Sequence, residues 1–166
     1  MKYLNWVKKA ETPDVENYHI LACDESKRKQ SAVINLISGF VFFIMIFGAG
    51  ILNHHSSSKA WIFYPYISTM IPAVYFIAGA LAFMKCTVNL SKKQWDSSLG
   101  RCSHSAIALL ILCILNLILD VIFIIIHSKT GFNFWEIIYL LIFVILTLLC
   151  IVYGKFFDKN FAKNGI

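Results

Sequence analysis

Four long apolar runs constrain this chain more than any other feature of its sequence. They cover residues 32–52, 61–84, 105–126 and 134–154. The shortest run has 21 residues. That length is enough to cross the ~30 Å hydrocarbon core of a bilayer at ~1.5 Å per residue. The sequence therefore predicts an all-α membrane protein, an antiparallel bundle of four transmembrane helices.

Positive charge is distributed unevenly around these runs. Of the 15 Lys and Arg residues, 13 lie before the first run, between the second and third, or after the fourth. The other two connections contain only Lys59 and Lys129. Because positively charged segments stay on the cytoplasmic side during insertion, both termini are predicted to be inside. The net charge of +6 needs no nucleic acid to explain it and favours anionic lipid head groups as partners.

The apolar content leaves little room outside the membrane. With 58% hydrophobic residues in 166, the chain is predicted to be one membrane domain over residues 32–157. Residues 1–31 form a cytoplasmic segment with a basic amphipathic stretch and an acidic patch, and residues 158–166 form a short tail. The outer connections, about eight residues each, cannot hold a catalytic or ligand-binding domain.

Basic residues and cysteines near the inner boundary suggest contacts with lipid. Head groups are expected to bind Lys27, Arg28, Lys29, Lys92, Lys93 and Lys155. S-palmitoylation is chemically feasible at Cys86 and Cys102, although unmodified thiols are the favoured interpretation. No outer connection contains a cysteine, so no structural disulfide is expected. The glycosylation sequon at Asn89 lies in the inner connection and is predicted to be unused.

Small residues predict that the first two spans pack against each other. In lipid, helix association depends on close van der Waals contact, which small side chains allow. The candidates are Ser38, Gly39, Gly48 and Gly50 in the first span and Ala78, Gly79 and Ala82 in the second. Pro72 is expected to kink the second span and free a backbone carbonyl.

Asp120 is the only ionisable residue well inside a run. It shares a helical stripe with Cys113, Asn116 and His127. A buried carboxyl group is expected to be protonated or paired, here with Asn116, His127 or Lys129. Asp120 either couples a proton or cation, or hydrogen-bonds to a neighbouring helix or a partner subunit. The second interpretation is favoured, since a lone acid without a second buried charge or a broken-helix binding site is weak evidence for transport.

No pattern predicts a metal, a cofactor or catalysis. His54, His55, His127 and Glu136 could meet at the outer surface, but adjacent histidines cannot easily ligate one ion from a helix. The spacing matches no metal motif. No nucleophile–base arrangement or phosphate-binding loop is present, so the chain is not expected to be an enzyme.

Several local motifs resemble the transmembrane protein 50 family, which includes a fungal vacuolar-sorting subunit. They are the segment from Ser38 to Phe43, Leu99-Gly100-Arg101, Tyr139, and Gly154-Lys155-Phe156. The chain departs from the family at Phe47 and Ile51, where the family has a Trp pair followed by Asp. The resemblance implies a four-span, non-enzymatic protein of endosomal or Golgi membranes, acting in sorting within a membrane complex.

Two functions are therefore weighed. The leading hypothesis is a non-catalytic subunit or scaffold that binds another membrane protein. The alternative is a small proton- or cation-coupled transporter or channel component that uses Asp120. The expected location is an endomembrane if the chain is eukaryotic and the plasma membrane if it is bacterial.

Overall fold

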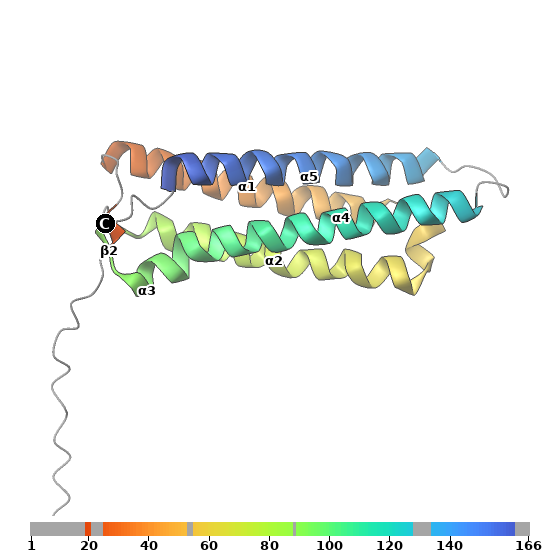
Figure 1. Cartoon of the computed structure of the whole chain (residues 1–166), viewed down its shortest axis with the longest axis horizontal. Helices are drawn as coiled ribbons and strands as arrows, with labels where there is room; N and C mark the ends of the chain where they lie inside the picture. Colours follow the sequence, from red (N-terminus) through yellow and green to blue (C-terminus); the bar gives the residue numbers. More distant parts are fainter. Residues whose placement is uncertain (1–18, 21–24, 53–54, 88, 128–133, 162–166) are drawn as a thin grey trace, which may run out of the picture.

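Four long helices lying side by side make up most of the molecule (Figure 1). The structure, a computed structural model, describes residues 19–20, 25–52, 55–87, 89–127 and 134–161. The helices are α1 (Glu25–Ile51), α2 (Ala60–Met84), α4 (Arg101–His127) and α5 (Phe134–Phe161). Each belongs to a segment long and apolar enough to cross a membrane. The predicted class, an all-α four-helix membrane protein, is confirmed.

The helices extend beyond the apolar runs at the end of the bundle that holds α3 (Lys92–Trp95). There α1 begins at Glu25, within the segment predicted to be soluble, and α5 continues to Phe161, within the predicted tail. Good helix formers such as Glu, Lys, Arg and Gln explain the early start of α1. Contacts of Phe161 with Phe83 and Phe157 explain the late end of α5.

The third span is one continuous helical segment of 36 residues. It begins with a capping box, in which the Ser91 hydroxyl accepts from the Gln94 N–H and the Gln94 side chain accepts from the Ser91 N–H. A π-helical turn, η2 (Asp96–Gly100), then leads into α4. The apolar run itself begins only at residue 105, because polar residues before it interrupt the hydropathy pattern.

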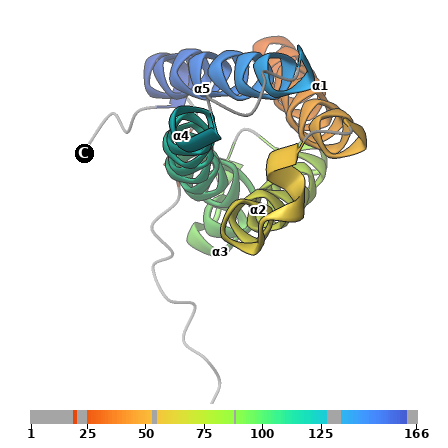
Figure 2. The same ribbon diagram turned by 90° about the vertical axis from the view of Figure 1, so that its right-hand side faces the viewer.

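The helices surround a common axis in the order α1, α2, α4, α5 (Figure 2). Each consecutive pair packs along its length, whereas α1 and α5 contact each other over a shorter stretch. The short 3-10 helix η1 (His55–Ser58) connects α1 to α2 at the end opposite α3. We call these two ends the η1 end and the α3 end; the charge pattern predicts that the α3 end is cytoplasmic.

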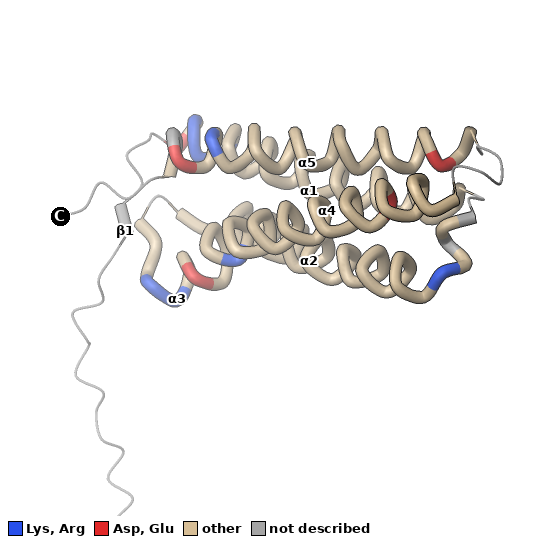
Figure 3. Tube along the Cα trace, turned by 45° about the vertical axis from the view of Figure 1, so that its right-hand side comes forward, with Lys and Arg blue, Asp and Glu red and all other residues tan. Residues whose placement is uncertain are grey.

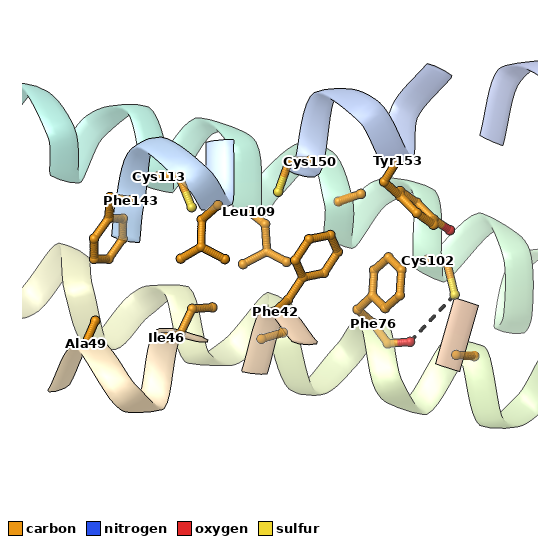
Figure 4. Close-up of a cluster of buried hydrophobic side chains, with 14 of the residues drawn as sticks. Phe42, Ile46, Ala49, Phe76, Cys102, Leu109, Cys113, Phe143, Cys150 and Tyr153 are labelled. Carbon is orange, nitrogen blue, oxygen red and sulfur yellow. Dashed lines mark hydrogen bonds between the residues drawn. The ribbon is translucent and has the colours of Figure 1, made fainter. Parts of the chain in front are cut away.

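Aromatic rings fill the middle of the bundle (Figure 4). The Phe42 and Phe76 rings meet edge to face, with centroids 5.4 Å apart. Tyr153 completes the group, with its centroid 4.9 Å from that of Phe76. Edge-to-face packing of this kind adds to the van der Waals contact that holds helices together in lipid. All three side chains are buried, so they separate the two ends of the interior.

A short strand pair covers part of the α3 end. Strand β1 (His19–Ile20) pairs antiparallel with β2 (Asn89–Leu90). Leu90 is fully buried in a second apolar cluster, which also contains Ala32, Phe83, Leu99 and Phe161. The sequon residue Asn89 therefore lies in a strand at the end predicted to be cytoplasmic.

Candidate functional site

The stripe of polar residues on α4 faces the interior of the bundle. Cys113, Asn116 and Asp120 are each fully buried. His127, at the end of the stripe, is only half-buried. Its ring stacks on Phe123 at a centroid distance of 4.2 Å, and Nδ1 lies 3.1 Å from the Phe123 carbonyl oxygen. The predicted stripe therefore exists, and Asp120 lies inside the protein rather than toward lipid.

A second acid, Glu136 in the first turn of α5, is also buried. Its Oε1 accepts a hydrogen bond from the Ser56 backbone N–H at 2.9 Å. Its Oε2 accepts one from the Ser56 hydroxyl at 2.7 Å. Ser56 is itself fully buried in η1. Glu136 thus ties the start of α5 to the connection between α1 and α2.

Asp120 and Glu136 form a buried carboxyl pair. The Asp120 carboxyl group is close enough to Glu136 and Ser56 to interact electrostatically with both. Figure 3 shows acidic positions on α4 and α5 near the same end of the bundle. The expectation that Asp120 is an isolated acid, with no second intramembrane carboxylate, is therefore wrong. Glu136 lies only two residues from the start of its run, so the sequence pattern alone predicts that it is at the outer surface.

The Asp120 carboxyl group has no hydrogen-bond donor among the residues that the structure describes. Within the described ranges, neither Oδ1 nor Oδ2 has a hydrogen-bond partner. The Ser56 hydroxyl, which lies near Asp120, donates to Glu136 Oε2 at 2.7 Å. A buried ionised carboxylate without a donor is strongly unfavourable. Two facing carboxyl groups can form a hydrogen bond only if one of them carries a proton.

Tyr139 lies between this carboxyl pair and the aromatic core. Its side chain is buried and interacts electrostatically with both acids. Its hydroxyl donates to Asn116 Oδ1 over a long 3.5 Å, while Asn116 Nδ2 donates to the Leu112 carbonyl at 2.8 Å. Its ring contacts Phe143, with centroids 4.9 Å apart. Asn116 therefore pairs with Tyr139 and with its own helix.

A separate buried polar pair lies on α1 and α5. The Tyr153 hydroxyl donates to Asn35 Oδ1 at 3.2 Å. No acceptor for Asn35 Nδ2 occurs among the residues that the structure places. The interior therefore contains polar groups besides the Asp120–Glu136 pair, and here a donor meets an acceptor.

The predicted helix-packing residues divide between two interfaces. A methyl group added to Gly39 would lie 2.9 Å from Phe76 Cδ1, so α1 approaches α2 closely at this point. One added to Gly79 would lie 2.9 Å from both Cys102 Sγ and the Ser98 carbonyl oxygen. Gly79 thus serves the contact of α2 with the third span, whereas the sequence analysis assigned it to the α1–α2 contact.

The other members of that set have varied surroundings. Pro72 is buried, and Ser38, Ala78 and Ala82 are half-buried. Gly50 lies beside the Tyr66 hydroxyl, which donates to the Ile46 carbonyl at 3.0 Å. Gly48 has no atom within 4 Å of an added methyl group, so it marks no close contact.

Most of the predicted lipid anchors are exposed at the α3 end (Figure 3). They are Lys27, Lys29, Lys92, Lys93 and Lys155. Arg28 is the exception, because its guanidinium group is buried between the Glu25 carboxylate, 2.6 Å away, and the Phe83 carbonyl oxygen. Arg28 therefore fastens α1 to the end of α2 instead of facing the head groups.

The two cysteines considered for palmitoylation differ in exposure. Cys86 is partly exposed, whereas Cys102 is fully buried and its thiol lies 3.6 Å from the Phe76 carbonyl oxygen (Figure 4). Burial removes Cys102 from the list of modification sites, because an acyl donor cannot reach its sulfur. Cys86 stays a candidate.

Some sequence predictions concern residues outside the described part of the chain. These are the basic stretch at the N-terminus, the acidic patch before Glu25, His54, the side chain of His55, and Lys129. Within the described part, no group of three or more His, Cys, Asp or Glu side chains could hold a metal ion.

No family model, curated protein or solved structure matches this chain. The resemblance to the transmembrane protein 50 family thus stays an expectation from sequence. Any function must be argued from the geometry of the bundle itself.

Proposed function

We propose that this multi-pass membrane protein binds a proton or small cation between Asp120 and Glu136, as a transporter or channel component. The observation that carries the proposal is the buried Asp120 carboxyl group, which has no hydrogen-bond donor among the described residues and lies beside a second carboxyl group. Ionisable residues within membrane spans commonly mark ion pathways. A bound proton or cation would stabilise this pair of carboxyl groups.

A purely structural role explains the pair less well. A polar contact that holds helices together joins a donor to an acceptor, as Tyr153 and Asn35 do. Ser56 and Glu136 form another such contact. Asp120 and Glu136 instead bring two acceptors together, which repel each other when both are ionised. Their contact becomes favourable only when a proton or cation lies between them.

The position of the pair suggests that ions reach it from the η1 end. Glu136 lies in the first turn of α5, and Ser56 lies in the connection at the same end. Toward the α3 end, the buried rings of Tyr139, Phe143 and Phe76 fill the interior. Passage across the membrane would require these rings to move.

Flux into liposomes tests this function. The full-length protein is reconstituted in sealed liposomes that contain proton- or sodium-sensitive dyes, and a gradient of either ion is imposed. Wild type is expected to dissipate one gradient, and Asp120→Asn is expected to reduce the rate to that of protein-free liposomes. Asp96→Asn is the matched control, because it makes the same replacement at an exposed acid. Wild-type rates equal to those of protein-free liposomes for both ions would contradict the proposal.

A second function, that of a complex subunit, is favoured by one face of α2. Tyr64 and Tyr75 expose 68% and 56% of their surface on the outside of the bundle. Two half-buried small residues, Ala78 and Ala82, lie farther along the same helix, nearer its C-terminal end. Hydroxyl groups and small residues are typical of helix–helix contacts in lipid. A role in endosomal sorting, implied by the family resemblance, is one form of this proposal.

Purification of the tagged protein in mild detergent tests the second function. A stoichiometric second membrane protein that is lost in a Tyr64→Leu/Tyr75→Leu variant would support it. A discrete assembly of this chain alone would count against it.

A further inference from the structure

We propose that the ligand of the carboxyl pair is a proton bound to Asp120, and that Ser56 keeps Glu136 as the charged member. This inference rests on the site described above and deepens its proposed function. It names the ligand, the residue that carries it and the residue that selects between the two acids.

The hydrogen bonds around Glu136 favour it, of the two acids, as the carboxylate. Each of its oxygens accepts one hydrogen bond from Ser56, at 2.9 Å from the backbone N–H and 2.7 Å from the hydroxyl. Donors that point at both oxygens stabilise the ionised form of a carboxyl group. A proton on Glu136 would displace or weaken one of these contacts.

The surroundings of Asp120 are the opposite. Its side chain is fully buried, and no described residue donates to either oxygen. Protonation gives Asp120 an O–H group that can donate to Glu136. Glu136 then accepts from three donors, namely the Asp120 O–H group and the backbone N–H and hydroxyl of Ser56.

A metal cation fits this site less well than a proton. Cations such as Ca²⁺ and Mg²⁺ require about six oxygen ligands. Asp120 and Glu136 supply at most four carboxyl oxygens between them, and Asn116 Oδ1 accepts from Tyr139. No third acidic side chain joins the pair within the described ranges. Too few oxygen ligands are left for a metal ion.

Loss of the proton would act on the contact between helices. Two negative charges would then face each other in a buried site, between α4 on one side and α5 with η1 on the other. Tyr139 of α5 interacts electrostatically with both acids, and its other titratable neighbours, Tyr66 of α2 and Cys113 of α4, are uncharged in their ordinary states; α1 contributes the Ile46 carbonyl group bound to Tyr66. Repulsion would therefore favour opening of the η1 end as the pH rises.

A hydrophobic carbodiimide reports which acid carries the proton. The carboxyl O–H proton passes to a nitrogen of dicyclohexylcarbodiimide, and the carboxyl oxygen bonds to its central carbon. The acyl group then shifts from oxygen to nitrogen and gives a stable N-acylurea, with no atom lost. Because this addition consumes the carboxyl proton, an ionised acid reacts far less. Full-length protein in phosphatidylcholine liposomes is treated over a range of pH, and the modified peptide is identified by mass spectrometry.

The expected result is an adduct on Asp120 that decreases as the pH rises. Ser56→Ala removes one donor from Glu136, so the adduct ratio is expected to shift toward Glu136 by about tenfold or more. Ser56→Thr retains the hydroxyl and should restore the wild-type pattern, which separates proton selection from general damage to the fold. Ser68→Ala is the control, since among the described residues its hydroxyl donates to the Tyr64 carbonyl of its own helix.

Two results would overturn the proton assignment. One is an adduct confined to Glu136 in wild type. The other is no adduct on either acid in a protein that carries sodium, which would leave the proposed transport function intact. Conversely, an adduct on Asp120 in a protein without any flux would support the proton assignment and contradict transport.

Discussion

Replacement of Gly79 by alanine tests the close approach of α2 to the third span. The added methyl carbon would lie 2.9 Å from Cys102 Sγ, 2.9 Å from the Ser98 carbonyl oxygen and 3.2 Å from Arg101 Cβ. The Ser98 oxygen belongs to the backbone, so it cannot rotate away as a side chain can. The two segments must therefore move apart by a few tenths of an ångström, which loosens their packing.

The magnitude follows from two opposing effects. Overpacking a well-filled interior costs about 1–3 kcal/mol. Alanine in place of glycine within a helix offsets up to about 1 kcal/mol of this. With the full offset, Gly79→Ala is therefore expected to lower the free energy of unfolding by about 0–2 kcal/mol, and to be about 1–3 kcal/mol less stable than an alanine replacement with no close contact. Gly48→Ala makes the same replacement where no atom lies within 4 Å, so it should be neutral or slightly stabilising.

Unfolding in mixed micelles, followed by circular dichroism as the fraction of denaturing detergent rises, compares the two variants. A double-mutant cycle then combines Gly79→Ala with Cys102→Ala. Removal of the sulfur should recover part of the loss, with a coupling of about 0.5 kcal/mol or more. If Gly79→Ala were as stable as Gly48→Ala, the packing described for this interface would be refuted.

Three further predictions concern the core, a helix start and the orientation. Phe76→Ala removes the ring that packs on Phe42 and Tyr153, and should lower the free energy of unfolding by about 3–5 kcal/mol, measured by the same titration. Ser91→Ala removes the capping box and should cost about 1 kcal/mol of stability. Amide hydrogen exchange in α3 should become faster, and unchanged exchange would contradict the role of the cap. Asn89 should stay unglycosylated in a eukaryotic host, since glycan there would reverse the predicted orientation.

The helices were predictable from the sequence, because length and apolarity alone decide whether a segment can span a membrane. The ends of the helices were harder to predict than their existence. Polar residues before position 32 and before position 105 look like connections in a hydropathy pattern. In the structure, Arg28 and the Ser91 capping box make them helical. Such contacts depend on partners distant in sequence or on local caps, which a window of apolar residues does not report.

The candidate site was predictable only in part. Asp120 is conspicuous, because an acid in the middle of an apolar run has few structural explanations. Glu136 is inconspicuous, because acids are common at the ends of such runs. Its burial depends on Ser56, which is 80 residues away along the chain. The signal that could have found it is an acid placed inside an apolar run, directly after Phe134 and Trp135.

Infrared difference spectroscopy during a pH titration tests the central claim most directly. A protonated carboxyl group has a C=O stretching band distinct from that of a carboxylate, and the band disappears when the proton is lost. The protein in liposomes is predicted to show such a band for a buried carboxyl group in wild type and in Asp96→Asn, but not in Asp120→Asn. Identical spectra for wild type and Asp120→Asn would contradict a proton held by Asp120.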